Sequence, residues 1–430
     1  MASDVDPLDS DDWGPSAGRG RRERRRERER RRVEKAYRRE QRPPRPERTE
    51  RHWTRLLGLP VAALALVTVV GLIALWPAAE HHRRSQAFGG KTVGAKVTAV
   101  RDIRCPGPTA QRCRQLEIEV GNRNAPLTLG PANLAPRIER GDAIRVQPVA
   151  APNGARHVEP YEFAGLDRRG TLLWLLVAFA ALVIVMTRWR GLLALAGFAL
   201  SLLLVTRFVV PAIAQGSSPV LVALVGSLAV MFITVGLTYG LSPQSAAAIL
   251  GIAGSLLFGT VVGTLAVHAA RLDGRSSEYS TVLSQANTRI SLQGIVLGGL
   301  VIAALGVLAD MAVTQASAVM ALRRANPDLP ARPLFRAGFG VGRDHLVATT
   351  HTLVLVYVGA TLPLLLVLHS VGVGFTDALN AQDVAEPIVA TLVGALALLV
   401  SVPLTTALAT LLLARVPVEQ LPAVHHGHAH

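Results

Sequence analysis

A single aspartate, Asp310, lies inside a long apolar stretch, where a charged side chain is costly and its presence suggests a role. It ends the glycine-rich run GGLVIAALGVLAD and is followed by Thr314 and Ser317, with Gln315 beside them. Spacings of four and three residues place the carboxylate and the two hydroxyls on one face of a helix. We expect this face to look into a helix bundle, because a carboxylate in hydrocarbon must be paired, hydrated or protonated.

A second set of ionisable residues opens the next apolar stretch. Arg343 and Asp344 belong to the sequence GRDH, and His351 lies about two turns further along. Two interpretations stay open: Asp310 pairs with Arg343 across adjacent helices, or the two helices line a pathway or a coupling-ion site. His351 could likewise be a neutral, hydrogen-bonded imidazole or a proton carrier.

Long apolar stretches must position these groups. Each is near or above the roughly 20 residues that a helix needs to cross a bilayer. The chain has 50% hydrophobic residues and a mean hydropathy of +0.35. The stretch 56–76 is too long and too far from the start to be a signal peptide, so it is predicted to be a retained anchor. The other predicted helices are 171–187, 191–214, 219–238, 244–268, 291–321, 346–369 and 388–414. The predicted fold class is a mainly α, polytopic membrane protein, with a bundle of about eight transmembrane helices.

Small residues recur at intervals of four in the helix 244–268. Gly259 and Gly263 form a GxxxG pair, and Ser255 extends the row by one step. Such rows let helix backbones approach closely. Packing inside one chain is the favoured interpretation, and the face of a homo-oligomer is the alternative.

Residues 77–170 form a separate domain of predicted β structure between the anchor and the bundle. The segments Val97–Val100, Gln115–Val120 and Ala143–Gln147 are short, β-branched and roughly alternating, and Pro, Gly and Asn separate them. Gly141 and Asp142 precede the last of these segments, as hairpin entries often do. Five or six such strands would suit a small barrel or a sandwich, and a compact barrel, for example of the oligosaccharide/oligonucleotide-binding type, is the favoured interpretation.

Both cysteines of the chain, Cys105 and Cys113, lie in this β domain. In an oxidising exterior compartment their spacing suits a disulfide that closes a surface loop, which would stabilise the domain by roughly 2.5 kcal/mol. A metal site would need further ligands, and the sequence places no His or Cys close enough to propose one. No metal or cofactor is therefore predicted.

The formal net charge of +15 is concentrated in a tail, since residues 1–55 carry 18 of the 45 Lys and Arg residues. The tail is predicted to be disordered and to attract anionic membrane lipid, at about 1 kcal/mol per basic residue. Nucleic-acid binding is not expected, because interleaved aromatic residues are few. The arginines at 188–190 and 323–343 are predicted to lie on the same side of the membrane as the tail. Because basic residues are retained on the cytoplasmic side, we expect a plasma-membrane protein with both termini cytoplasmic, including the His-rich segment 415–430. That segment could bind metal weakly, or be a solvated end or a tag remnant.

The motifs of enzymes and of nucleotide binding are missing from the sequence. It contains no HExxH, no GxSxG, no second membrane aspartate set up as a partner to Asp310, and no phosphate-binding loop. A transporter of an unknown small solute or ion, driven by an ion gradient or by an ATPase partner, is therefore preferred to an enzyme. The rival class is an envelope sensor or assembly scaffold that uses the β domain to bind a ligand or partner.

Several motifs in order resemble the YibE/F-like membrane proteins. They are LGVLADMAVTQASA at Leu305–Ala318, GRDH at Gly342–His345 and TLVLVYVG at Thr352–Gly359. The segments Tyr161–Phe163, Asp167–Arg169 and Ser277–Glu278 fit the same pattern. The resemblance spans about residues 90–414 and implies an anchor, an extracytoplasmic domain and a bundle of about seven helices. Transport is the role that it suggests.

Overall fold

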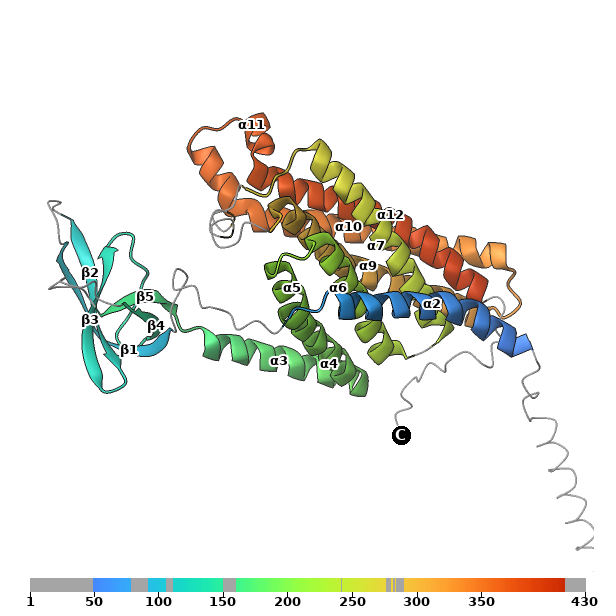
Figure 1. Cartoon of the computed structure of the whole chain (residues 1–430), viewed down its shortest axis with the longest axis horizontal. Coiled ribbons are helices and arrows are strands. Elements are labelled where there is room, and N and C mark those ends of the chain that lie inside the picture. Colours follow the sequence, from blue (N-terminus) through green and yellow to red (C-terminus); the bar gives the residue numbers. More distant parts are fainter. Residues whose placement is uncertain are drawn as a thin grey trace, which may run out of the picture. The chain divides into compact units, whose positions relative to one another are not determined.

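The computed structural model describes residues 49–78, 92–105, 111–149, 160–240, 242–275, 280, 283 and 290–413 (Figure 1). Most of the predicted basic tail, the His-rich segment 415–430 and Ser277–Glu278 lie outside the described residues. The chain divides at Pro60 into two compact units, and every contact discussed below belongs to the second unit, which begins at Val61.

Helices make up most of the described residues. They are α2 (Thr49–Ala74), α3 (Arg169–Thr187), α4 (Trp189–Leu204), the π-helix η1 (Val205–Val209), α5 (Val210–Ala214), α6 (Pro219–Tyr239), α7 (Pro243–Ala269), α9 (Leu292–Ala325), α10 (Ala331–Ser370), α11 (Phe375–Asn380) and α12 (Gln382–Leu413). Seven spans among the described residues are long and apolar enough to cross a membrane, with α4, η1 and α5 forming one of them. A shorter apolar helix, Gly58–Ala74, lies within α2. The predicted fold class, a helical membrane protein with a separate β domain, is confirmed.

Helix α10 begins much earlier than the sequence analysis predicted. The residues from Ala331 to Arg343, which precede the predicted helix 346–369, form its first turns. Leu334, Gly338 and Gly342 recur every four residues there and are the buried residues of α10. The charged residues between them lowered the hydropathy of the segment without interrupting its helical periodicity.

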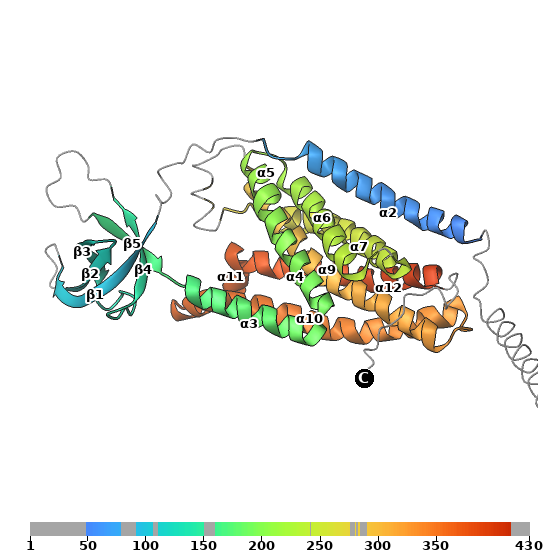
Figure 2. The same cartoon turned by 90° about the horizontal axis from the view of Figure 1, so that it is seen from below.

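Helices α7 and α12 pack against each other through the row of small residues. A Cβ atom added to Gly259 would lie 3.1 Å from the Cβ atom of Ala397, and one added to Gly263 would lie 3.5 Å from Cγ1 of Val393. One turn from Ser255, Gly251 lies directly against Thr405. Figures 1 and 2 show α7, α9 and α12 running side by side. The row therefore serves packing within one chain, as the sequence analysis favoured.

The end of α2 is fixed to the end of the α4–α5 span. The rings of Trp76 and Phe208 stack with their centroids 5.7 Å apart. The amide side chain of Gln215 donates to the carbonyl of Ala78 over 2.8 Å and accepts from the N–H of Ala78 over 2.9 Å. This paired contact joins the chain before the β domain to the bundle that follows it.

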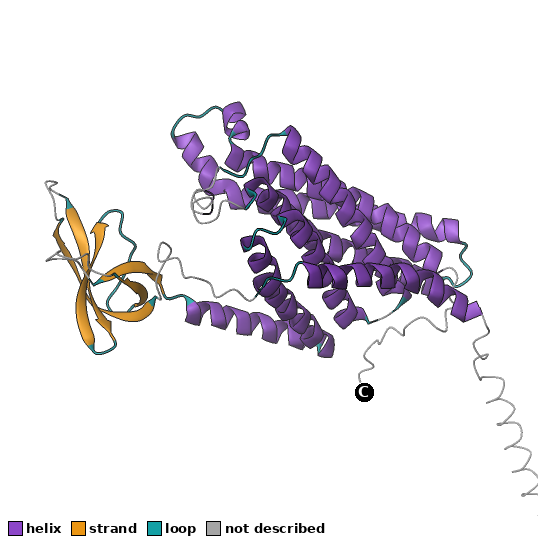
Figure 3. Cartoon of the chain, viewed as in Figure 1, coloured by secondary structure: helices purple, strands orange, loops and turns teal. Residues whose placement is uncertain are grey.

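The β domain is a curled, five-stranded antiparallel half-barrel (Figure 3). Its strands are β1 (Val93–Arg104), β2 (Arg112–Val120), β3 (Arg123–Pro131), β4 (Ala143–Pro148) and β5 (Tyr161–Leu166). The order β3-β2-β1-β4-β5 places the fourth strand beside the first, as in a Greek key. Alternate residues such as Leu116, Ile118 and Ile144 are fully buried in its core. The three predicted strand segments are confirmed.

The predicted disulfide between Cys105 and Cys113 is present, with a Cα–Cα distance of 4.8 Å. It joins the end of β1 to the start of β2, and both cysteines are buried.

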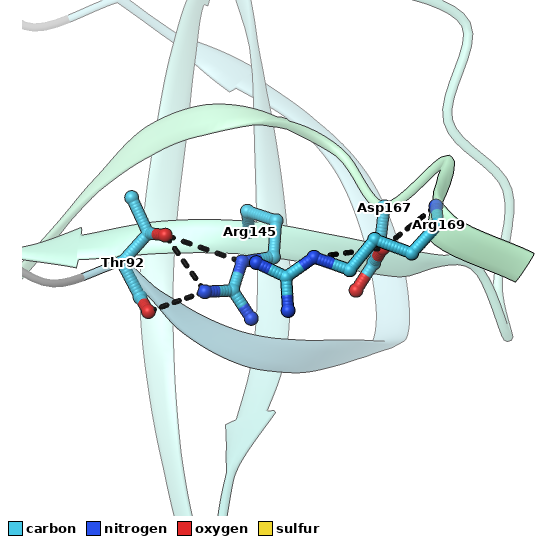
Figure 4. Close-up of polar contacts among 4 residues, drawn as sticks. All are labelled: Thr92, Arg145, Asp167 and Arg169. Atoms are coloured by element: carbon cyan, nitrogen blue, oxygen red, sulfur yellow. Dashed lines mark hydrogen bonds and ion pairs between the residues drawn. The ribbon is translucent and has the colours of Figure 1, made fainter. Parts of the chain in front are cut away.

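One arginine forms hydrogen bonds between the start of the β domain and its fourth strand. The guanidinium of Arg145, on β4, donates to the hydroxyl of Thr92 over 2.7 Å and also to the carbonyl of Thr92 (Figure 4). Arg145 also pairs in register with Gly94 of β1 and Gly165 of β5. Asp167 follows β5 and accepts a hydrogen bond from the N–H of Arg169 at the start of α3. The segments that enter and leave the domain therefore meet at β4.

We expect Gly251→Ala to destabilise the protein by about 1 to 3 kcal/mol, because the added methyl group collides with a rigid, fully buried threonine. The matched control is Gly236→Ala on α6, where an added Cβ meets nothing within 4 Å. Thermal unfolding in detergent should show a lower midpoint for Gly251→Ala only. Equal midpoints for the two variants would show that the contact between α7 and α12 is not tightly packed.

Candidate functional site

Helix α9 exposes one open row of residues. An added Cβ at Gly299 or Gly306 would meet nothing within 4 Å, which differs from the close contacts of the glycines on α7. The members of the row are spaced by three or four residues and therefore lie on one face. They are Gly299, Ala303, Gly306, Asp310 and Thr314, and we call them the open row.

Asp310 lies about midway along α9, in the open row. Within the described residues it forms neither a hydrogen bond nor an ion pair. The expectation that it faces the bundle interior, within reach of Arg343, is wrong. It is Gln315 that faces α10, and five residues correspond to about 140° of rotation around the helix, which points Asp310 away from α10.

Tyr239 has charged residues of two other helices near it. Asp310 and Arg190 both lie close enough to the Tyr239 hydroxyl to act on it electrostatically. Tyr239 ends α6, and Arg190 lies in the first turn of α4. The sequence analysis did not identify this grouping, because nothing in the spacing of residues 190, 239 and 310 predicts that the start of α4, the end of α6 and the middle of α9 lie close together.

Gln315 is buried and joins three helices. Its side-chain amide donates to the carbonyl of Gly338 on α10 and to the hydroxyl of Thr406 on α12, each over 2.7 Å. Its carbonyl oxygen lies against Gly342, where a Cβ atom would come within 2.5 Å of it. Thr406 in turn donates to the carbonyl of Val402 over 2.6 Å. Gln315 therefore holds α9, α10 and α12 together.

Ser317 and Thr314 have different surroundings although both are close to Asp310 on the helix. The amide of Gln244, at the start of α7, donates to the Ser317 hydroxyl over 2.5 Å. The Ser317 hydroxyl donates to the carbonyl of Val313 over 2.8 Å. Thr314 is exposed. Ser317 thus belongs to the packing between α7 and α9.

The predicted residues of α10 lie apart from Asp310. Arg343, Asp344 and His351 are exposed, and in the described part of the chain none of them forms a hydrogen bond or an ion pair. From Arg343 to Ser370 no residue of α10 is buried. The hydroxyls of Thr349, Thr350 and Thr352 bond to carbonyls one turn earlier in their own helix. The predicted site is thus divided among the open row, the Gln315 junction and the outer face of α10.

The open row offers one chemical function, because Asp310 is its only ionisable residue. A carboxylate within a membrane-length helix can bind and release a proton, and inside a membrane it is stable as a charge only beside a cation, a hydrogen-bond donor or water. Across the described ranges, no three His, Cys, Asp or Glu side chains come together as a metal site would require.

Comparison with protein families matches residues 175–415 to the family described as YibE/F-like protein. The matched segment begins within α3 and extends to the end of α12. It includes Asp310, Gln315 and the whole of α10, and it leaves out the β domain. The comparisons with curated proteins and with solved structures gave no match.

We expect Gln315→Leu to lower the stability of the protein by about 1 to 3 kcal/mol, because it leaves the Gly338 carbonyl and the Thr406 hydroxyl without the amide. Thr314→Val, on the preceding residue, changes an exposed side chain and should have little effect. Chemical or thermal unfolding of both variants in the same detergent tests this. A Gln315→Leu protein as stable as Thr314→Val would show that the junction does not hold the three helices.

Proposed function

The chain belongs to the YibE/F-like protein family, and we propose that it is a proton-coupled transporter in which Asp310 binds and releases the coupling proton. The observation that carries the proposal is an exposed carboxylate, midway along a membrane-length helix, without a hydrogen bond from any described residue. A proton is the ion that suits the site, because a metal cation needs several oxygen ligands and the open row offers one carboxylate.

The neighbours of Asp310 suggest how protonation could be coupled to movement. Tyr239 has Asp310 and Arg190 near it, and in our proposal a charged Asp310 contacts the Arg190 guanidinium and the Tyr239 hydroxyl. When Asp310 is protonated, this attraction is lost and the neutral side chain can face an apolar surface. A proton would therefore change the balance between two arrangements of α4 relative to α9.

Helix α4 begins at a joint whose geometry fits such a movement. Arg188, between α3 and α4, has φ of 54°, a backbone conformation that is costly for a residue other than glycine. Helix α3 has no buried residue, and the helix that it contacts is α4. The joint places Arg190 two residues from the strained position. A shift of this helix pair would move Arg190 relative to Asp310.

We place the end of the bundle that carries Arg190 in the cytoplasm of a plasma-membrane protein. The basic tail precedes α2, and Arg323, Arg324, Arg332 and Arg336 lie at the same end of α9 and α10. Positively charged residues are retained on the cytoplasmic side. In this topology the β domain and its disulfide are outside the cell, where disulfides persist.

A role as an envelope sensor is the second candidate. The observation in its favour is the contact of Arg145 with Thr92, next to the pairing of β4 with β5. A ligand bound to the half-barrel could act through β4 on the segments that lead to α2 and α3. In this case the charge of Asp310 would not be required for signalling.

We expect Asp310→Asn to abolish proton coupling while the fold keeps its stability to within about 1 kcal/mol, because no described contact of Asp310 is lost. Purified protein is reconstituted in liposomes that enclose a pH-sensitive dye, and a panel of small solutes is added to each preparation. At least one solute should drive proton movement through the wild-type protein, and Asp310→Glu should retain it.

The matched control is Asp328→Asn, which removes an exposed carboxylate from the loop between α9 and α10. It should transport like the wild-type protein. Infrared spectra should in addition contain a carboxyl band that appears on acidification and is missing from Asp310→Asn. Solute-driven proton movement that persists in a folded Asp310→Asn protein would refute the proposal.

A further inference from the structure

Charged residues gather on one face of the half-barrel, where β1 ends and β2 begins. In the antiparallel pairing of these strands Asp102 lies opposite Arg114, and Arg104 lies opposite Arg112. Residues directly opposite each other project from the same face of a sheet, and so do residues two apart on one strand. All four side chains therefore share one face, and we call these four residues the arginine cluster.

The arginine cluster continues the face of the sheet that carries the core. Leu116, two residues after Arg114, is fully buried. Val100, two residues before Asp102, lies opposite Leu116 and packs against the same core. The guanidinium of Arg114 donates to the carbonyl of Pro136 over 3.5 Å. The cluster therefore lies at the end of the core, between buried apolar side chains and solvent.

The charges of the cluster do not balance. Arg104 and Arg112 are exposed, and in the described part of the chain neither forms a hydrogen bond or an ion pair. Like charges directly opposite each other destabilise a sheet. Nε of Arg114 lies 3.6 Å from Oδ1 of Asp102, which is too long for a hydrogen bond, and this buried nitrogen has no hydrogen-bond partner. Three guanidinium groups against one carboxylate leave a net charge of +2.

The opposite face of the same two strands is arranged differently. Arg101 pairs with Glu117 over 3.1 Å, and Lys96 lies opposite Glu119 in the strand register. Each cation there has an acid across the strand, which is the arrangement that stabilises a sheet without a ligand. The unbalanced charge is thus particular to the face with the arginine cluster.

We propose that the arginine cluster binds a phosphate monoester group. The guanidinium fork matches two phosphate oxygens, and a phosphate between Arg104 and Arg112 would replace their repulsion by two attractions. A phosphate monoester carries a charge of about −1.5 to −2 at neutral pH, close to the opposite of the charge of the cluster, whereas a carboxylate carries only one negative charge. This binding requires neither transport nor sensing, so its failure would leave both proposed functions unaffected.

Calorimetric titration of the full-length protein in phosphatidylcholine nanodiscs tests the site, with glycerol phosphate as the probe. Arg104→Gln and Arg112→Gln should each weaken binding at least about ten-fold, because each removes charge-assisted hydrogen bonds. The matched control is Arg101→Gln, three residues before Arg104 and on the opposite face, which should bind like the wild-type protein. Asp102→Asn should bind more tightly, because it removes the one negative charge of the cluster.

The charge of the ligand provides a second test. The second pKa of a phosphate monoester is about 6, so glycerol phosphate should bind several-fold more weakly at about pH 5 than at about pH 7.5. Sulfate keeps both charges over this range and serves as the reference, with no such loss expected. An affinity for glycerol phosphate that is unchanged at the lower pH would contradict recognition of the doubly charged form.

Nanodiscs that contain phosphatidic acid distinguish a lipid from a soluble ligand, because its headgroup is a phosphate monoester. If a headgroup occupies the cluster, phosphatidic acid should block the binding of glycerol phosphate, and phosphatidylglycerol at equal total charge should not. If the ligand is soluble, the two lipids should leave equal affinities. Either result supports a phosphate site.

Two results would overturn the proposal. One is a wild-type protein that does not bind glycerol phosphate in phosphatidylcholine nanodiscs. The other is undiminished binding by the double variant Arg104→Gln/Arg112→Gln. Both arginines are exposed, so the β domain of this variant should fold, and an intact disulfide between Cys105 and Cys113 in mass spectra checks that it has done so.

Discussion

Polar groups inside a membrane protein are stabilised by partners within the protein, and this constraint explains how α9 is held in the bundle. Gln315 satisfies it by bonding to α10 and α12 at once, so that a single amide sets the position of three helices. Ser317 satisfies it through Gln244 of α7. The threonines of α10 satisfy it through carbonyls of their own helix. Asp310 lies about midway along α9 and forms no such bond within the described residues, and for this reason it carries the proposed function.

The features predicted correctly from sequence depend on short-range patterns. Apolar length identified the helices, alternation identified the strands of the β domain, and the spacing of Cys105 and Cys113 identified the disulfide. The row of small residues on α7 was also interpreted correctly, because glycines at intervals of four leave few alternatives to close helix packing. Each of these inferences concerns neighbours in sequence, where helical or strand geometry fixes the outcome.

The incorrect predictions concern the direction in which one face of α9 points and the residue at which α10 begins. Helical spacing established that Asp310 and Thr314 share a face, but it does not determine whether that face points inward or outward. The burial of Gln315, only one residue beyond Thr314, decides the rotation of α9. The start of α10 was missed because hydropathy falls where Arg332 and Arg336 appear, although Gly338 and Gly342 continue the buried face. Contacts between residues far apart in the sequence therefore place in different surroundings the residues that the sequence analysis grouped into one site.

The arrangement of strands at Arg145 has a consequence for how this protein could have been assembled. Gly94 near the start of β1 and Gly165 near the end of β5 both pair with Arg145, so the half-barrel begins and ends at one place. A module with adjacent ends can be inserted between two helices, exchanged or removed without stretching the chain that flanks it. The matched family segment begins after this module. The bundle and the half-barrel can thus be inherited as separate parts, with the surface of the half-barrel free to diverge while the interior of the bundle stays constrained.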